Sequence, residues 1–123
     1  MISIPKIVVL EIGRPVVEDV KQQIGEPYKV ISYPRPILEA EYPQILREAY
    51  QAIREAARGG EEVILVLSGP LALAFQLGQL VGLSHFKIRV YQFSMGRYRE
   101  VPPVTRDVMF SEEDSKWRTA IQI

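Results

Sequence analysis

Apolar and polar positions alternate along this chain in blocks that predict strands followed by helices. Two apolar runs of strand length, Pro5 to Leu10 and Val63 to Leu67, each lead into a turn that holds a glycine and then a proline. A continuous apolar run is typical of a strand that is covered on both faces of a parallel sheet. Proline suits the first turn of a helix because it has no amide hydrogen to leave unpaired, so we expect a helix after each turn.

The remaining elements follow from the spacing of their apolar residues. Three-to-four spacing predicts helices, and alternation predicts strands. The expected helices are Pro15 to Gly25, Glu41 to Arg58 and Pro70 to Val81, and the expected further strands are Tyr28 to Tyr33, Lys87 to Phe93 and Arg97 to Val101.

The order of these elements predicts an α/β fold, a Rossmann-like, doubly wound and mostly parallel sheet with a C-terminal β-hairpin. Right-handed crossovers give the strand order 2-1-3-4, in which the first and third strands are neighbours. Ligands bind such sheets beyond the carboxyl ends of the strands, where the chain reverses direction. The turns Glu11 to Pro15 and Ser68 to Pro70 are therefore expected to flank one crevice, whose helix N-termini suit an anion such as phosphate.

We expect residues 1–103 to form the ligand-binding domain and residues 104–123 to form a tail or an edge element. Within the second part, Thr105 to Phe110 suggests one more edge strand. Ser111 to Asp114 resembles a helix cap.

Composition narrows the classes of function. The chain has 123 residues, and its 15 Lys and Arg balance 15 Asp and Glu, so nothing favours long duplex DNA or a membrane surface. It has no cysteine and one histidine, which argues against a metal centre. The spacing of GxGxxG and the P-loop motif are absent, so neither a dinucleotide cofactor nor another cofactor is expected. We expect a cytoplasmic protein because no signal peptide or membrane span is recognisable.

Residues 65–82 and 87–102 resemble the SAVED family, which is related to CARF domains. The resemblance covers about the C-terminal half of the ligand-binding domain. It consists of an apolar strand, a small-residue turn with proline, an Ala-rich helix with Phe and a Leu-Gly pair, and a strand that ends in Val-Tyr. The matching residues are Ser68, Gly69, Pro70, Ala72, Ala74, Phe75, Leu77, Gly78, Val90, Tyr91 and Tyr98.

The resemblance implies a sensor-like protein that binds a cyclic oligonucleotide in prokaryotic antiviral signalling. SAVED domains are commonly fused to an effector and built from two halves, whereas this sequence offers one half. The resemblance therefore points to a small protein of type III CRISPR systems that binds cyclic oligoadenylate, with cyclic tetra-adenylate as the expected ring. Such a protein either sequesters the ring or, as the alternative, opens it as a metal-independent ring nuclease.

Assembly as a homodimer is a further expectation, because a cyclic tetranucleotide has two-fold symmetry and two copies offer it one shared site. The helix Pro70 to Val81 is apolar nearly all round, which fits either a dimer interface or a helix enclosed in the core.

The expected binding residues follow from the chemical groups of an adenine nucleotide. Phosphates need cations and backbone amides, and bases need stacking surfaces. Arg99 is a possible reinforcement, and Glu11 is a candidate for a ribose hydroxyl or an adenine edge. The expected ligand-binding residues are Glu11, Ile12, Gly13, Arg14, Tyr33, Arg35, Ser68, Gly69, Pro70, Met95, Arg97 and Tyr98. No catalytic residue is assigned.

Overall fold

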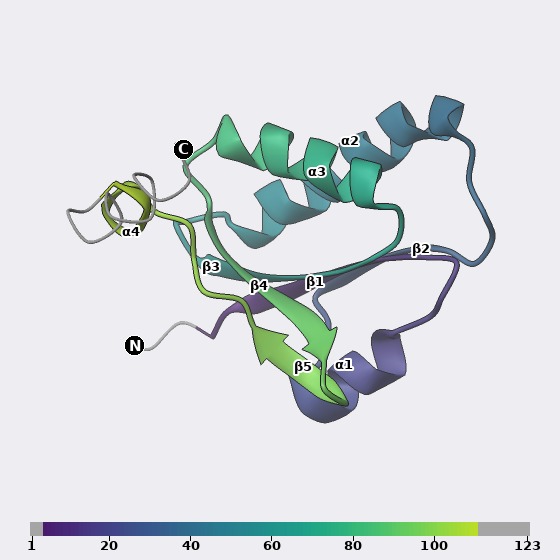
Figure 1. The fold of residues 1–123 in the computed structure, drawn as a ribbon, viewed down its shortest axis with the longest axis horizontal. Helices are drawn as coiled ribbons and strands as arrows, with labels where there is room; N and C mark the ends of the chain where they lie inside the picture. Colours follow the sequence, from purple (N-terminus) through teal and green to yellow (C-terminus); the bar gives the residue numbers. More distant parts are fainter. Residues whose placement is uncertain (1–3, 111–123) are drawn as a thin grey trace, which may run out of the picture.

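A five-stranded sheet in the order β2-β1-β3-β4-β5 organises the chain (Figure 1). The computed structural model describes residues 4–110. The first four strands are parallel, and β5 pairs antiparallel with β4. The predicted order 2-1-3-4 and the C-terminal hairpin are both confirmed. The strands are β1 (Lys6–Ile12), β2 (Lys29–Tyr33), β3 (Glu62–Ser68), β4 (Lys87–Ser94) and β5 (Arg97–Glu100).

Helices cover the two faces of this sheet unequally. Helix α1 lies on one face, and α2 and α3 lie side by side on the other (Figure 1). Each of these helices follows a parallel strand, as right-handed crossovers require. The helices are α1 (Val17–Gln23), η1 (Glu39–Glu41, a 3₁₀ turn), α2 (Tyr42–Ala56), α3 (Leu71–Gly82) and α4 (Arg106–Met109).

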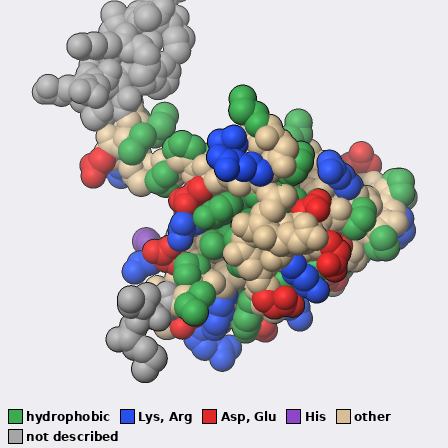
Figure 2. All heavy atoms as spheres, turned by 90° about the horizontal axis from the view of Figure 1, so that it is seen from below, with side chains coloured by type: hydrophobic (Ala, Val, Ile, Leu, Met, Phe, Trp, Pro, Cys, Tyr) green, Lys and Arg blue, Asp and Glu red, His purple; other side chains and the backbone are tan. Residues whose placement is uncertain are grey.

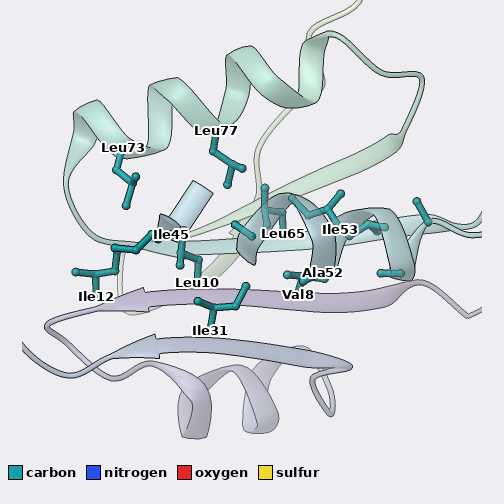
Figure 3. Close-up of a cluster of buried hydrophobic side chains, with 14 residues drawn as sticks. Val8, Leu10, Ile12, Ile31, Ile45, Ala52, Ile53, Leu65, Leu73 and Leu77 are labelled. Atoms are coloured by element: carbon teal, nitrogen blue, oxygen red, sulfur yellow. The ribbon is translucent and has the colours of Figure 1, made fainter. Parts of the chain in front are cut away.

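The hydrophobic core lies on both faces of the two central strands. Val8 of β1 and Val63 of β3 are fully buried under α2 and α3, where Leu73 and Leu77 of α3 point toward the sheet (Figure 3). A second apolar cluster on the opposite face joins Val9 and Val66 to Val20 of α1. The continuous apolar runs of the sequence thus form strands that are covered on both faces.

Helix α3 is buried on one side only. Its outer side exposes Leu71, Phe75 and, just after its end, Leu83, at 88%, 70% and 84% of their surfaces. The expectation of a helix enclosed in the core does not hold, because only α2 and the sheet cover α3 among the described residues. Within residues 4–110, no helix combines the length and apolar character that crossing a membrane requires.

Two boundary expectations differ from the structure. Residues Thr105 to Phe110 were expected as an edge strand, which is wrong: Arg106–Met109 form α4, because the Thr105 hydroxyl accepts a hydrogen bond from the Val108 amide and caps a helical turn. The helix cap expected at Ser111 to Asp114 lies outside the described residues. Strand β1 continues through Ile12, so Glu11 belongs to the strand and not to the turn.

Candidate functional site

The carboxyl ends of the four parallel strands meet along one side of the sheet, which we call the carboxyl rim. The last residues of these strands are Ile12, Tyr33, Ser68 and Ser94. Because parallel strands end on the same side, the loops that follow them gather there. The residues of those loops that the sequence singled out are Gly13, Arg14, Arg35, Gly69, Pro70 and Met95.

Glu11 is buried just below the rim and binds inward. One carboxylate oxygen accepts hydrogen bonds from the Val16 and Val17 amides at 2.6 and 3.2 Å, and the other accepts one from the Ser32 hydroxyl at 2.9 Å. Only 7% of its surface is exposed. The carboxylate therefore satisfies the free amides at the start of α1, which would otherwise suit an anion. This arrangement occupies the side chain that was expected to bind a ribose or a base.

The space between the two glycine-proline turns is filled. Ile12 is buried in the core and lies under Gly69, where a Cβ atom on the glycine would stand 3.1 Å from the Ile12 Cβ. The Gly13 amide donates a hydrogen bond to the Tyr33 carbonyl at 2.8 Å and is engaged within the protein. The cavity between the ends of β1 and β3 measures only about 10 Å³. Ile12 and Gly69 thus pack closely at the place where the crevice was expected.

Tyr33 and Arg35 also have partners within the chain. The Tyr33 hydroxyl donates to Glu48 at 2.8 Å, and burial and this hydrogen bond raise the pKa of the phenol. The Arg35 guanidinium binds Glu41 at 2.6 Å and lies 5.8 Å from the Tyr33 ring. Both side chains are at the rim, but they hold the loop after β2 against α2.

A cation and two aromatic rings gather at the other end of the rim. The Arg14 guanidinium lies 5.7 Å from the centre of the Phe93 ring, and the Phe93 and Tyr98 rings meet edge to face at 5.5 Å. Phe93 and Tyr98 are cross-strand partners in the β4–β5 hairpin. The Tyr98 amide donates to the Gln23 side chain of α1 at 2.7 Å, and burial raises the pKa of its phenol. We call Arg14, Phe93 and Tyr98 the rim cluster.

The tip of the hairpin is open to solvent beside this cluster. Met95 is 88% exposed and has a positive φ of 53°, which a tight turn requires. Arg97 is exposed, and residues Arg97 and Tyr98 help to line a hollow of about 540 Å³ along β5. The rim also contains the half-buried Ser68 at the end of β3. The start of α3 follows it, and no side chain caps the first amides of this helix.

Sequence reasoning missed Phe93. Its place in the alternation of Lys87 to Phe93 identified it only as one apolar residue of a half-exposed strand. It also missed a groove of about 520 Å³ between β2 and α2, lined mostly by polar side chains such as Gln44, Arg47 and Glu55. The alternation of residues in β2 predicted an edge strand. The polar face of α2 did not indicate that this helix and β2 would enclose a groove.

The electrostatic character of the molecule is mixed. Figure 2, which views the molecule from the α1 side, shows acidic and basic side chains interspersed over that face. Any anion must therefore be bound by local cations and amides. Across residues 4–110, no three acidic or histidine side chains gather as metal ligands would.

Comparisons with known proteins agree on the fold. Two solved structures of the Acinetobacter baumannii Cap4 SAVED/CARF-domain containing receptor match the chain. The first has a TM-score of 0.65 and 18% identity, and covers 81% of this chain and 24% of the receptor chain. The second, of the receptor with the cyclic trinucleotide 2'3'3'-cAAA, has a TM-score of 0.60 and 20% identity over 80% and 24% of the two chains.

The chain thus spans about a quarter of the length of the receptor that it matches. Comparison with curated proteins finds no match. The family model described as "SMODS-associated and fused to various effectors sensor domain" matches residues 7–102. This range includes the three main helices and the whole sheet except the first residue of β1. By this match the chain belongs to the SAVED family.

Proposed function

We propose that this protein binds a cyclic oligonucleotide on the carboxyl rim, between the start of α3 and the tip of the β4–β5 hairpin. The observation that carries the proposal is the Arg14 cation beside the exposed ring of Phe93 near the end of β4. The uncapped amides of α3 follow β3, the strand between β1 and β4. Cations and backbone amides bind phosphates, and rings stack on bases. Membership of a sensor family and the likeness to a receptor solved with a cyclic trinucleotide support this ligand class.

Within that class we propose cyclic tetra-adenylate as the ring, in the setting of a type III CRISPR antiviral response. The working unit is a homodimer that pairs along the exposed side of α3, with one ring shared by two rims. Leu71, Phe75 and Leu83 give this side an apolar surface that a second copy would cover. A two-fold pair of rims matches the two-fold symmetry of a four-nucleotide ring.

We propose sequestration as the role of binding. Cleavage without a metal requires a ribose 2'-hydroxyl to attack the neighbouring phosphorus, and a general base typically accelerates such a step about 10²- to 10⁴-fold. Glu11 is the carboxylate that the sequence placed at the end of β1, and its oxygens already accept hydrogen bonds from two amides and a hydroxyl. This engagement favours a protein that holds the ring intact.

Calorimetric titration with cyclic di-, tri-, tetra- and hexa-adenylate, with adenosine monophosphate as the control ligand, tests the proposal. We expect one cyclic tetra-adenylate to bind per two chains. Arg14→Ala should weaken binding by about 1.5 to 3 kcal/mol, since it removes a charge-assisted contact to phosphate. Arg54→Ala, a substitution on the exposed face of α2, serves as the matched control and should leave the affinity unchanged.

Four results would contradict parts of the proposal. Absence of binding to every ring would reject the ligand class, and preference for another ring would reject the tetramer. Equal affinities of the Arg14 variant and the wild type would reject the role of that cation. Sequestration is tested by incubating the cyclic oligonucleotide with excess protein in EDTA. Conversion of the ring to a product with a 2',3'-cyclic phosphate would show cleavage and reject sequestration.

A further inference from the structure

Phe93 lies where a ligand at the carboxyl rim could contact it, although the alternation of β4 identified it only as an apolar strand residue. It is the penultimate residue of β4, and 47% of its surface is exposed. Two neighbours restrain this exposed ring. The centres of the Phe93 and Tyr98 rings are 5.5 Å apart in an edge-to-face arrangement, and the Arg14 guanidinium lies 5.7 Å from the centre of the Phe93 ring. An aromatic ring that is both exposed and held in one orientation is suited to stacking.

The arrangement of the strands explains why this ring lies beside the phosphate-binding candidates. Strand β3 lies between β1 and β4, so the Arg14 side chain, which follows β1, reaches across the end of β3 to meet the ring on β4. Ser68 ends β3, and the uncapped start of α3 follows within three residues. Tyr98, the cross-strand partner of Phe93, packs on the α1 face of the sheet, whereas α3 packs on the other face. A nucleotide that lies across the end of β3 would reach both the aromatic surface and the amides of α3.

We propose that Phe93 is the base-stacking residue of the rim and that the ligand class it selects is a nucleotide with a large, flat purine base. This inference rests on the proposed function and adds the part of the site that reads the base. The phosphate belongs with Arg14 and the amides of α3, and the base stacks on the Phe93 ring, with Met95 at the turn as an apolar flank. Arg14 has a second role, because its guanidinium orients the ring while no base is bound.

The competing interpretation is that Phe93 only seals the end of the hairpin. Hairpin stability does depend on cross-strand aromatic pairs, so Phe93→Ala alone would not separate the two roles. Phe93→Leu keeps apolar bulk against Tyr98 but removes the flat ring. Phe93→Trp keeps a ring and adds a fluorescent reporter.

Tyr28 provides a matched control at the opposite end of the strands. Its ring is also 47% exposed, and the Lys6 ammonium lies 4.8 Å from its centre. It precedes β2 and so lies at the amino ends of the strands, away from the rim. Tyr28→Leu therefore removes an equally exposed ring beside a cation without touching the proposed site.

The experiment measures the affinity of cyclic tri- and tetra-adenylate for the wild type, Phe93→Leu, Phe93→Trp and Tyr28→Leu, with circular dichroism as the check on folding. Loss of one base stack typically weakens binding by a factor of about 5 to 150. We expect that loss in Phe93→Leu, near-wild-type affinity in Phe93→Trp, and no change in Tyr28→Leu. Equal affinities of folded Phe93→Leu and wild type would overturn the inference and leave the proposed function in place.

A second arm keeps the inference testable if no ring binds. Phe93→Trp is combined with Trp117→Phe, which removes the single natural tryptophan, so that position 93 alone reports. Linear tri-adenylate is the probe. Quenching by this probe, absent when the indole is placed at position 28 instead, would support base stacking at Phe93 even though the ring-binding function had failed. No quenching and no ring binding would overturn both.

Discussion

A buried carboxylate fixes the first crossover of the fold. Glu11 lies in β1, yet its oxygens reach the amides of Val16 and Val17 at the start of α1 and the hydroxyl of Ser32 on β2. It therefore ties one helix and two strands together. A charged group stays in such a place only when its hydrogen bonds offset the loss of its water shell.

We predict that Glu11→Ala destabilises the protein by about 2 to 4 kcal/mol, because two amides and a hydroxyl lose a charged acceptor. Urea unfolding followed by circular dichroism measures the free energy of unfolding. Glu18→Ala, at an exposed position of α1, is the control and should change it by less than about 0.5 kcal/mol. Equal stabilities of the two variants would show that the cap contributes nothing.

The role of Glu11 was not predictable from its neighbours in the sequence. The apolar run ends at Leu10, so Glu11 was assigned to the turn and to ligand binding. Its hydrogen bonds join residues that are five and six positions away, and a third joins a different strand, which periodicity does not reveal. Arg14 was placed correctly at the rim because its position depends only on where β1 ends.

At the scale of elements, the loop after β2 is held by an ion pair instead of by burial. Arg35 follows the strand, and Glu41 ends the 3₁₀ turn η1; their side chains meet at 2.6 Å. Glu41 also accepts a hydrogen bond from the Leu38 amide at 2.8 Å. The Arg35–Glu41 pair thus orders the entry into α2.

The hydrogen bond from Arg35 lowers the pKa of Glu41 from its ordinary value of 4.5 to about 2. A lowered pKa in the folded protein means that the stabilisation is complete above about pH 4.5 and disappears as the pH falls through about 2. We predict that Glu41→Gln flattens the decline of stability across this interval. Unfolding by urea at a series of pH values measures it, with the exposed Glu39→Gln as the control. An unchanged decline in Glu41→Gln would contradict the prediction.

The strands and main helices were predictable because each has either a continuous apolar run or a clear apolar period, whereas residues 105–110 have neither. Their weak alternation suggested a strand, and the hydrogen bond from the Val108 amide to the Thr105 hydroxyl made a helical turn instead. The importance of Phe93 also escaped prediction. Its significance depends on Tyr98 and Arg14, and only the sheet brings β1, β4 and β5 together.

At the scale of the whole molecule, the helical layer of α2 and α3 leaves part of its own apolar surface exposed. The layer of α2 and α3 (Figure 1) buries a large apolar cluster. The apolar side chains of Leu71 and Phe75 on α3 are nevertheless exposed. Exposed apolar surface that is concentrated on one helix is typical of an interaction site. The proposed homodimer gives this surface a partner of the same shape.

We predict that Phe75→Asp converts the dimer into a folded monomer, because a charge at the centre of an apolar interface lacks a partner. Light scattering gives the molar mass. Leu38→Asp is the control: Leu38 is also 70% exposed but lies in the loop after β2, so this variant should remain dimeric. A monomeric wild type, or a dimeric Phe75→Asp, would refute pairing along α3.

The antiparallel strand at the end of the sheet has a consequence for how the family can diversify. A hairpin tip can change length without disturbing the parallel strands behind it. Residues added in pairs at 95–96 would lengthen β4 and β5 and leave the pairing of Phe93 with Tyr98 in register. Such insertions would move the tip farther over the rim. On the proposed function, a change in the length of this tip would alter which ring sizes the rim accepts and would leave the core unchanged.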